Sequence, residues 1–261
     1  MIKFSIITVC LNAGADLKYT VDSILQQKYE NYELIIKDGF STDGSIERLP
    51  NDSHIHFIQS KDTSVYDAMN QAVNQACGEY CIFINAGDTL YDPSTLRQIA
   101  DFIERIPGDF YYGKSHTVSS GVMNYGPANV TKYYCYRTTM CHQAMVIKTS
   151  YLKNRGYDTS YLISADREWM VYAYVQAKMR FVRMPMVVSN YKGGGMSSGE
   201  EILDILKEET ARINRTHFTK AERIKFGAMR AVTLPGLRSK ISRNPKFKSV
   251  YYKIRYKYLS R

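Results

Sequence analysis

Two short apolar segments near the N-terminus constrain the fold more strongly than any other feature of this chain. Residues 34–36 lead into Asp38, residues 80–84 lead into Asp88, and both junctions are rich in acids and glycines. A short continuous apolar run is typical of a parallel strand that is buried on both faces. Because open α/β sheets bind ligands outside the carboxyl ends of such strands, the two loops predict one ligand site at a shared sheet edge.

Strand and helix patterns alternate through the first part of the chain and loosen after residue 107. Apolar runs predict strands at residues 4–9, 32–37, 55–59, 80–84, 110–113, 144–148 and 181–188. Apolar stripes at helical spacing predict helices around residues 17–25, 65–76, 92–106, 161–177 and 200–216. The predicted fold class is α/β, with a mostly parallel sheet, right-handed crossovers and flanking helices.

The composition is that of a folded protein from a reducing compartment. Hydrophobic residues make up 44% of the 261 residues, so a sizeable core can form. No apolar run approaches the roughly 18 residues of a membrane span, and the chain enters its first strand at Phe4 without a signal-type segment. We therefore expect an untargeted, cytoplasmic protein. The five cysteines include no C-x-x-C pair, which favours buried thiols over a zinc site or disulfides.

Positive charge is concentrated at the C-terminal end. The net charge is +10, and the segment from Arg223 onward holds twelve Lys and Arg and no Asp or Glu. Tyrosines alternate with these cations in residues 251–258, a pattern that suits a membrane interface or single-stranded nucleic acid. A solvated, disordered tail is the plain alternative. The asymmetry predicts an anionic surface as partner.

The first acidic loop holds Asp38, Ser41 and Asp43 together with two glycines, Gly39 and Gly44. A carboxylate there can accept a hydrogen bond from a ribose hydroxyl or a base N–H, and the glycines let a ligand approach the backbone. The same residues also suit a capped turn at a helix N-terminus. Asp67 and Asn70 are three positions apart near the start of the next predicted helix and therefore share a face. They are either ligand contacts or part of an acidic first turn that complements the helix dipole.

Two further acids are candidates for the chemistry. Asp88 ends a strand, and a carboxylate in a fixed loop is a suitable ligand for Mg²⁺ or Mn²⁺, although a turn acid is the alternative. Asp166 begins a helix and is a candidate general base, with Glu168 as a rival and a helix cap as the plain interpretation. Trp169, the single tryptophan, is either a sugar platform or core.

Two other segments stay ambiguous at this level. His142-Gln143 precedes a strand, where a lone histidine is more often structural than functional. Residues 193–197 combine three glycines with Met196 and Ser197, and suit either a mobile loop that closes over a diphosphate or a linker.

In order along the chain, several segments resemble the family-two inverting glycosyltransferases, most closely the bacterial subgroup that builds colanic acid, capsule and O-antigen repeats. The resemblance covers roughly residues 3 to 200 and rests on an ordered set of segments: residues 5–9, Asp38-Gly39-x-Ser41-Thr42-Asp43-Gly44-Ser45, residues 65–70, Asn85-Ala86-Gly87-Asp88, His142-Gln143, Ser164-Ala165-Asp166 and the glycine cluster. The chain departs from the family at Phe40, usually Gly or Ser, at Ser64, usually Gly, and in its single acid at Asp88.

The resemblance implies a Rossmann-like GT-A fold for a domain over residues 1–222. For residues 223–261, the charge pattern adds the expectation of a helical, basic, Tyr-rich tail that associates with a membrane. Within the domain, residues 1–106 would form the nucleotide-binding half and residues 107–222 the acceptor-binding half. It implies a catalytic base at Asp166 and a metal, Mn²⁺ or Mg²⁺, held by Asp88. The donor would contact Thr8, Asn12, Asp38, Ser41, Asp43, Asp67 and Asn70. The acceptor or the diphosphate would contact His142, Gln143, Trp169, Gly194 and Ser197.

The implied reaction moves a sugar from a UDP-sugar, with galactose as the first expectation, to a lipid-diphosphate-linked acceptor that contains GlcNAc or GalNAc. The product would belong to O-antigen or another surface polysaccharide, made at the inner face of the bacterial plasma membrane. A GDP-fucose or GDP-mannose transferase is the enzymatic alternative. A non-catalytic module that binds a sugar-nucleotide or RNA is the alternative outside the enzymes. Nucleic acid is a less expected partner than a sugar-nucleotide or a membrane.

Overall fold

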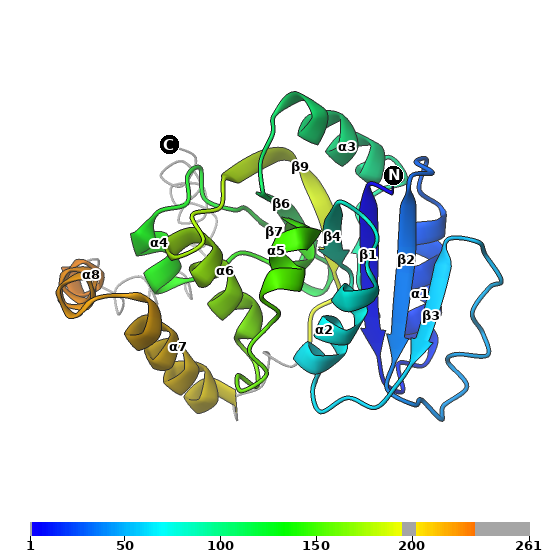
Figure 1. The fold of residues 1–261 in the computed structure, drawn as a ribbon, viewed down its shortest axis with the longest axis horizontal. Coiled ribbons are helices and arrows are strands. Elements are labelled where there is room, and N and C mark those ends of the chain that lie inside the picture. Colours follow the sequence, from blue (N-terminus) through cyan, green and yellow to red (C-terminus); the bar gives the residue numbers. More distant parts are fainter. Residues whose placement is uncertain (1, 195–201, 233–261) are drawn as a thin grey trace.

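A mixed β-sheet forms the centre of the molecule, and helices cover both of its faces (Figure 1). The computed structural model describes residues 2–194 and 202–232. The strands are β1 (Phe4–Cys10), β2 (Tyr32–Asp38), β3 (Ile55–Gln59), β4 (Tyr80–Phe83), β5 (Thr89–Leu90), β6 (Phe110–Thr117), β7 (Val122–Asn124), β8 (Met145–Lys148) and β9 (Phe181–Tyr191). The α-helices are α1 (Ala15–Leu25), α2 (Val65–Gln75), α3 (Thr95–Arg105), α4 (Lys132–Arg137), α5 (Thr149–Asn154), α6 (Ala165–Val175), α7 (Leu203–His217) and α8 (Lys220–Val232).

The N-terminal half of the sheet is parallel, as the apolar runs predict. Strand β1 lies between β2 and β4, and its parallel register brings Cys10 opposite Asp38. All seven residues of β2 and all four of β4 are buried, which explains their lack of alternation. The carboxyl ends of β1, β2 and β4 therefore meet at one edge, and the predicted α/β fold class is confirmed.

The second half of the sheet is mixed. Strand β8 pairs antiparallel with β4 and with β6, whereas β9 runs parallel to β6. The full order is β3-β2-β1-β4-β8-β6-β9-β5, with β7 paired to β6 as a hairpin. The hairpin and the start of α6 thus approach the carboxyl edge of the parallel strands from the other side.

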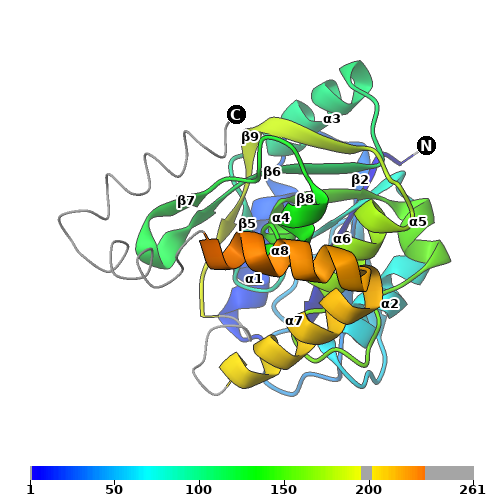
Figure 2. The ribbon, with the colours of Figure 1, turned by 90° about the vertical axis from the view of Figure 1, so that its left-hand side faces the viewer.

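Two hydrophobic cores hold the layers together. On one face, α1 and α3 pack on the sheet through residues such as Leu17, Ile24 and Ile99. On the other face, α2 and α6 contribute Met69, Trp169 and their neighbours. Helices α7 and α8 lie outside this second layer, next to α4 and α6 (Figure 2).

Helix α8 spans the expected domain boundary at residue 222. Its Phe226 is 7% exposed and packs against the rings of Tyr133, Tyr136 and Phe218. The first residues of the predicted tail are therefore part of the folded body, and residues 233–261 lie outside the described part of the chain.

Candidate active site

A cavity of about 1330 Å³ opens at the carboxyl edge of the sheet, between the parallel strands and the β6–β7 hairpin. The loop after β4, the segment after α4, the start of α6 and the segment after β9 form its walls. Five of the predicted site residues line it: Asp88, His142, Gln143, Asp166 and Gly194. The structure thus gathers residues that are more than 100 positions apart in the sequence.

Asp88 is held from two sides at the base of this cavity. The side chain is 4% exposed; Oδ2 accepts a hydrogen bond from Gln143 Nε2 at 2.7 Å, and Oδ1 accepts one from the backbone N–H of Lys192 at 2.9 Å. Burial raises the pKa of Asp88 to about 6, with the nearby Asp16 adding to the rise and these two hydrogen bonds opposing it. The carboxylate is therefore held in one orientation, and burial disfavours its charged form.

Asp16 and Lys192 also line the cavity, beside Asp88. Lys192 Nζ lies 2.6 Å and 2.8 Å from the two carboxylate oxygens of Asp16. The loop before Asp88 packs tightly on α1. Gly87 has a positive φ of 94°, and a Cβ atom at this position would lie only 3.2 Å from Asp16 Oδ2. The cavity therefore contains two carboxylates and one ammonium group at its base.

The oxygen atoms at this base fit a hard divalent cation. Asp88, Asp16 and Asn85 all line the cavity, and the buried Oδ1 atom of Asn85 has no hydrogen-bond partner in the described structure. Carboxylate and amide oxygens are the ligands that Mg²⁺ and Mn²⁺ prefer. The described residues hold no cluster of three or more His, Cys, Asp and Glu of the kind that forms an all-protein cage. Substrate phosphates would therefore have to complete the coordination.

Asp166 reaches the cavity from the first turn of α6. The hydroxyl of the buried Tyr66 lies 3.2 Å from Asp166 Oδ1 and donates to the carbonyl oxygen of Ile163 at 2.5 Å. Burial, together with the charge of Asp166, raises the pKa of Tyr66, so its hydroxyl stays protonated. Tyr66 thus connects α2 to the start of α6 and fixes where the Asp166 carboxylate lies.

Glu168, the rival base, faces the opposite way. It is buried away from the cavity, forms a paired contact with Arg155 at 2.7 Å and 3.0 Å, and lies 2.7 Å from His217 Nε2. Burial opposes ionisation, but the hydrogen bonds from His217 and Arg155 outweigh it and lower the pKa of Glu168. Glu168 therefore ties α6 to α7, and the geometry leaves Asp166 as the acid that a substrate can reach.

His142 and Gln143 form the cavity wall beside β4. The His142 ring stacks on Phe83, and its Nε2 lies 2.9 Å from the hydroxyl of Tyr157. Burial lowers the pKa of His142, although the charge of Asp166 opposes the shift, so a neutral imidazole is expected at pH 7. His142 thus offers a neutral polar group to a ligand, and Gln143 orients Asp88.

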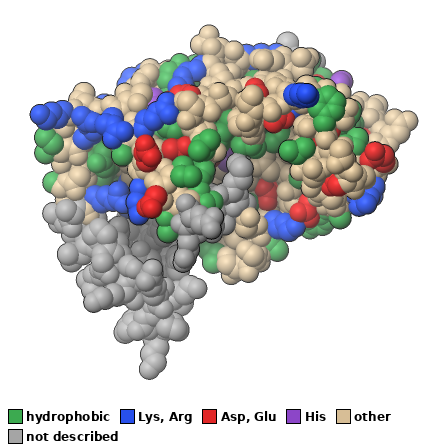
Figure 3. Space-filling model, turned by 90° about the horizontal axis from the view of Figure 1, so that it is seen from below, with side chains coloured by type: hydrophobic (Ala, Val, Ile, Leu, Met, Phe, Trp, Pro, Cys, Tyr) green, Lys and Arg blue, Asp and Glu red, His purple; other side chains and the backbone are tan. Residues whose placement is uncertain are grey.

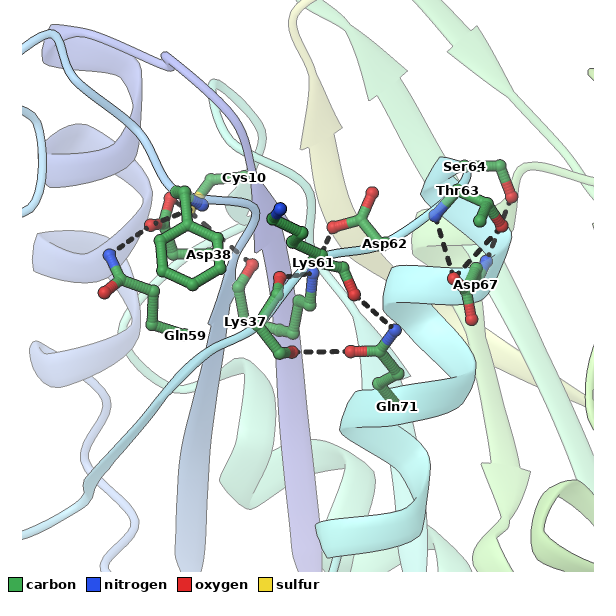
Figure 4. A network of polar contacts seen from close by, with 12 residues as sticks. Cys10, Lys37, Asp38, Gln59, Lys61, Asp62, Thr63, Ser64, Asp67 and Gln71 are labelled. Carbon is green, nitrogen blue, oxygen red and sulfur yellow. Dashed lines mark hydrogen bonds and ion pairs between the residues drawn. The ribbon is translucent and has the colours of Figure 1, made fainter.

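Asp38 is buried beneath the loop that it organises (Figure 4). Its carboxylate accepts from the backbone N–H groups of Phe40 and Ser41 at 3.0 Å and from Gln59 Nε2 at 2.9 Å. Burial disfavours the charged form, yet the hydrogen bonds from Gln59 and Ser41 lower the pKa of Asp38. Its contact with the nucleoside stays a prediction, and the carboxylate as observed is occupied by these hydrogen bonds.

Asn12, Ser41 and Asp43, three of the other predicted donor residues, join the loops after β1 and β2. The Asn12 N–H donates to Ser41 Oγ at 2.8 Å, and Asp43 Oδ2 accepts from the Gly14 N–H at 2.7 Å. Thr8 is buried and donates to the carbonyl oxygen of Ile84 at 2.8 Å. These contacts fix the edge of the sheet, and the donor contacts of these residues stay predictions.

Asp67 and Asn70 have structural partners and do not line the cavity. Asp67 accepts from the Thr63 N–H at 2.8 Å while its own N–H donates to Ser64, a reciprocal cap at the start of α2 (Figure 4). Asn70 uses both ends of its amide on the backbone of Tyr157, at 2.8 Å and 2.9 Å. The alternative of an acidic first turn describes the observed position of Asp67.

Trp169 requires a correction, because the structure places it in the core and not at the cavity. It is 1% exposed, stacks beside Phe110 and donates from Nε1 to the carbonyl oxygen of Arg155 at 2.6 Å. A sugar platform needs an open ring face, which this position lacks. Gly194 lines the cavity with a φ of 77°, whereas Ser197 lies outside the described residues.

The sequence interpretation missed the polar groups that complete the site. Asp16, Lys192 and Tyr66 line the cavity, as do Thr138 and Thr139 after α4. Asp16 is an acid in a first helical turn and Lys192 precedes a glycine cluster, both common arrangements. Asp16 and Lys192 come together only because α1 and the segment after β9 both pack against the loop before Asp88.

The structural comparison defines the class first. The crystal structure of S. aureus TarS 1-349 in complex with UDP-GlcNAc matches with a TM-score of 0.69 at 19% identity, over 86% of this chain and 70% of that chain. At this identity the likeness shows the fold, which is the GT-A fold of glycosyltransferases. The predicted GT-A architecture is thereby confirmed.

The family follows from the sequence. Residues 5–166 match Glycosyl transferase family 2, so the chain belongs to this family and is a glycosyltransferase. A relative from Mycobacterium bovis (strain BCG / Pasteur 1173P2), named PGL/p-HBAD biosynthesis glycosyltransferase, is 32% identical over 203 residues, which cover 75% of this chain and 79% of the relative. The putative teichuronic acid biosynthesis glycosyltransferase TuaG of Bacillus subtilis (strain 168) is 30% identical over 122 residues, 45% of this chain and 48% of that protein. The choice between an enzyme and a non-catalytic binding module is thus decided for the enzyme.

Proposed function

We propose that this glycosyltransferase moves a sugar from a UDP-sugar to a hydroxyl group of a glycolipid or surface-polysaccharide precursor, with inversion at the anomeric carbon. The observation that carries this proposal is the cavity that presents Asp166 on one wall and Asp88 with Asp16 at its base. One carboxylate that can accept a proton and two that can hold a cation beside a diphosphate are the groups that a single displacement requires.

In the proposed reaction Asp166 takes the proton of the acceptor hydroxyl. The acceptor oxygen attacks the anomeric carbon from the face opposite the diphosphate, the bond from that carbon to the diphosphate oxygen breaks, and UDP leaves with the bond electrons. Asp88, Asp16 and Asn85 would hold Mn²⁺ or Mg²⁺, which when bound neutralises charge on the leaving diphosphate. Lys192 and the backbone N–H groups of Gly193 and Gly194 lie at the same cavity and would contact the phosphates.

The donor is proposed as a UDP-sugar because TarS, which shares the fold, is known in complex with UDP-GlcNAc. Galactose is our first proposal for the sugar, and a GDP-fucose or GDP-mannose donor is the alternative. For the acceptor we propose a GlcNAc- or GalNAc-containing chain on a lipid diphosphate, as in O-antigen synthesis. The names of the two relatives, which refer to PGL/p-HBAD and teichuronic acid biosynthesis, support a cell-envelope product.

A membrane surface is the proposed place of action. No helix in residues 2–194 or 202–232 has the length and hydropathy to cross a bilayer. Lysines and arginines gather on the side that carries α7 and α8 (Figure 3), where Lys207, Arg215, Lys220 and Arg223 line a depression between the two helices. Together with the basic residues 233–261, this side would face anionic lipid.

A donor screen tests the proposal. Purified protein is incubated with UDP-, GDP-, CMP- and TDP-sugars, Mn²⁺ and a lipid-diphosphate GlcNAc or GalNAc acceptor analogue, and released nucleotide and product mass are measured. We expect acceptor-dependent release of UDP from one donor. If no donor gave product or released nucleotide, and calorimetry detected no binding of UDP, the proposal would be contradicted.

The variant Asp166→Asn tests the proposed general base, and Asp158→Asn is its matched control. Loss of the general base is expected to lower kcat by about 10²- to 10⁴-fold, while UDP binding stays at the wild-type level. The variant Asp158→Asn alters an acid in a loop outside the cavity and should keep wild-type turnover. Equal turnover in Asp166→Asn and the wild type would exclude Asp166 as the base.

A further inference from the structure

Phe40 has a backbone conformation that its side chain does not favour. Its φ is 70°, in the left-handed region that glycine enters freely and that a bulky residue enters only under strain. The strained residue is held in place because its N–H donates to Asp38 Oδ2 at 3.0 Å. Observed strain of this kind is concentrated where a protein binds or transforms a ligand.

Packing inside the protein does not account for this strain. The Phe40 side chain is 48% exposed, and Leu11, on the neighbouring loop after β1, is 60% exposed. Gly39 lets the two loops approach, since a side chain at position 39 would begin 3.4 Å from Leu11 Cδ1. The fold thus places two large apolar side chains in water at the carboxyl edge of the sheet.

Polar groups lie beside this apolar pair. Gln59 donates from Nε2 to Asp38, and Figure 4 shows its amide oxygen pointing away from that contact. Asp38 is 0% exposed, so a ligand above it meets the groups that cover it before it meets the carboxylate. Apolar side chains next to an amide oxygen match a nucleobase, which has apolar faces and polar edges.

The loop after β1 connects this surface to the cavity. It runs from the exposed Leu11 to Asp16 at the cavity base, and the contacts Asn12–Ser41 and Gly14–Asp43 hold it against the loop after β2. A nucleotide with its base above Asp38 would therefore direct its phosphates along residues 12–16 toward Asp16 and Asp88.

We propose that Phe40, with Leu11, covers the base of the donor nucleotide, and that the strained backbone at position 40 is retained for this contact. The inference rests on the proposed UDP donor and goes beyond it by assigning the base contact to a residue outside the cavity. It predicts that the ring of Phe40 contributes to binding of UDP but not to binding of a diphosphate without a base.

Two substitutions at position 40 distinguish the effect of the aromatic ring from the effect of the strained backbone. Phe40→Ala removes the ring and keeps a side chain at positive φ, whereas Phe40→Gly removes the ring and relieves the strain. Phe57→Ala is the control, because Phe57 on β3 is 44% exposed and is not at positive φ. Binding of UDP and of inorganic diphosphate, each with Mn²⁺, is measured by calorimetry, and Tm is measured for each protein.

We expect both Phe40 variants to bind UDP about 5- to 150-fold more weakly, the range of a base-stacking contact, with diphosphate binding unchanged. Phe40→Gly should also raise Tm by about 2–4 °C, which excludes misfolding as the cause of the weaker binding. Wild-type affinity for UDP in Phe40→Gly would overturn the inference alone. A wild-type protein that bound diphosphate but not UDP would overturn both the inference and the proposed donor.

Discussion

Tyr66 shows how a single side chain can determine the geometry of the proposed base. Its hydroxyl lies between the carbonyl oxygen of Ile163 and Asp166 Oδ1, at 2.5 Å and 3.2 Å. We expect Tyr66→Phe to lower kcat about 10-fold, since a small displacement of a catalytic group has effects of this size or larger, and to leave the KM for the donor unchanged. Steady-state kinetics with the donor found in the screen measures both quantities.

The control is Tyr91→Phe, which removes a hydroxyl from a residue that is 41% exposed and does not line the cavity. A rise in the donor KM with an unchanged kcat would assign Tyr66 to donor binding and contradict its role in positioning Asp166. A large fall in Tm would assign it to the core.

Two acids that line the cavity were predicted as site residues from their place in the sequence. Asp88 follows an apolar run and Asp166 begins a helix; the structure places both at the cavity, and their roles stay predictions. The sequence did not indicate that Asp16, Lys192 and Tyr66 line the cavity, because only the tertiary fold brings them next to Asp88 and Asp166. Trp169 was misplaced for a related reason: one aromatic residue in a helix does not show which of its faces packs inward.

Among the secondary-structure elements, α6 and α7 are held together by the hydrogen bond between Glu168 and His217, and the charge of Glu168 depends on pH. Glu168 is buried between Arg155 and His217, and its pKa in the folded state is lowered. The unfolded value is near 4.5, so this carboxylate stabilises the folded state above that pH. The stabilisation is lost as the pH falls through the lower, folded-state pKa.

We therefore expect Glu168→Gln to lower the free energy of unfolding by about 3 kcal/mol at pH 7, because Arg155 and His217 are left without their partner. The difference from the wild type should shrink as the pH falls below 4. Urea unfolding at several pH values measures it, with the exposed Glu208→Gln on α7 as control. A pH-independent difference would show that the charge of Glu168 is not the cause.

Elements longer than three residues in the parallel half were predicted within a few residues of their observed bounds. The short strands β5 and β7 and the six-residue helices α4 and α5 were missed. These elements have too few residues to show a period, and β5 forms only because it pairs with β9 at Thr89–Leu90. The antiparallel pairing of β8 was also not predictable, since a short buried run has the same pattern in either direction.

At the scale of the whole molecule, the proposed site joins two halves of one sheet. The parallel half provides Asp16, Asp88 and the loop around Asp38, while the mixed half provides His142 and Asp166. The nucleotide-binding role of residues 1–106 and the acceptor-binding role of residues 107–222 stay predictions. The fold also places the proposed acceptor half next to the basic side of α7 and α8 (Figures 2 and 3).

The last prediction concerns this basic side and the tail that follows it. Residues 233–261 hold nine Lys and Arg and no acid. Truncation after Val232 keeps α8 and the buried Phe226, whereas truncation at residue 222 would remove this packing. We expect the protein that ends at Val232 to bind anionic phosphatidylglycerol vesicles about 100-fold more weakly than the full chain, which is the loss expected if about three of these basic residues engage the surface at about 1 kcal/mol each.

Co-sedimentation with vesicles measures this binding, and neutral phosphatidylcholine vesicles and high salt are the controls, since both remove the electrostatic attraction. Turnover on a short, water-soluble acceptor should be the same for both proteins, because the described residues that line the cavity all lie between Asp16 and Gly194. Turnover on the vesicle-bound acceptor should fall with the lost binding. Equal vesicle binding by the two proteins would contradict a membrane role for the tail and leave the face of α7 and α8 as the remaining candidate.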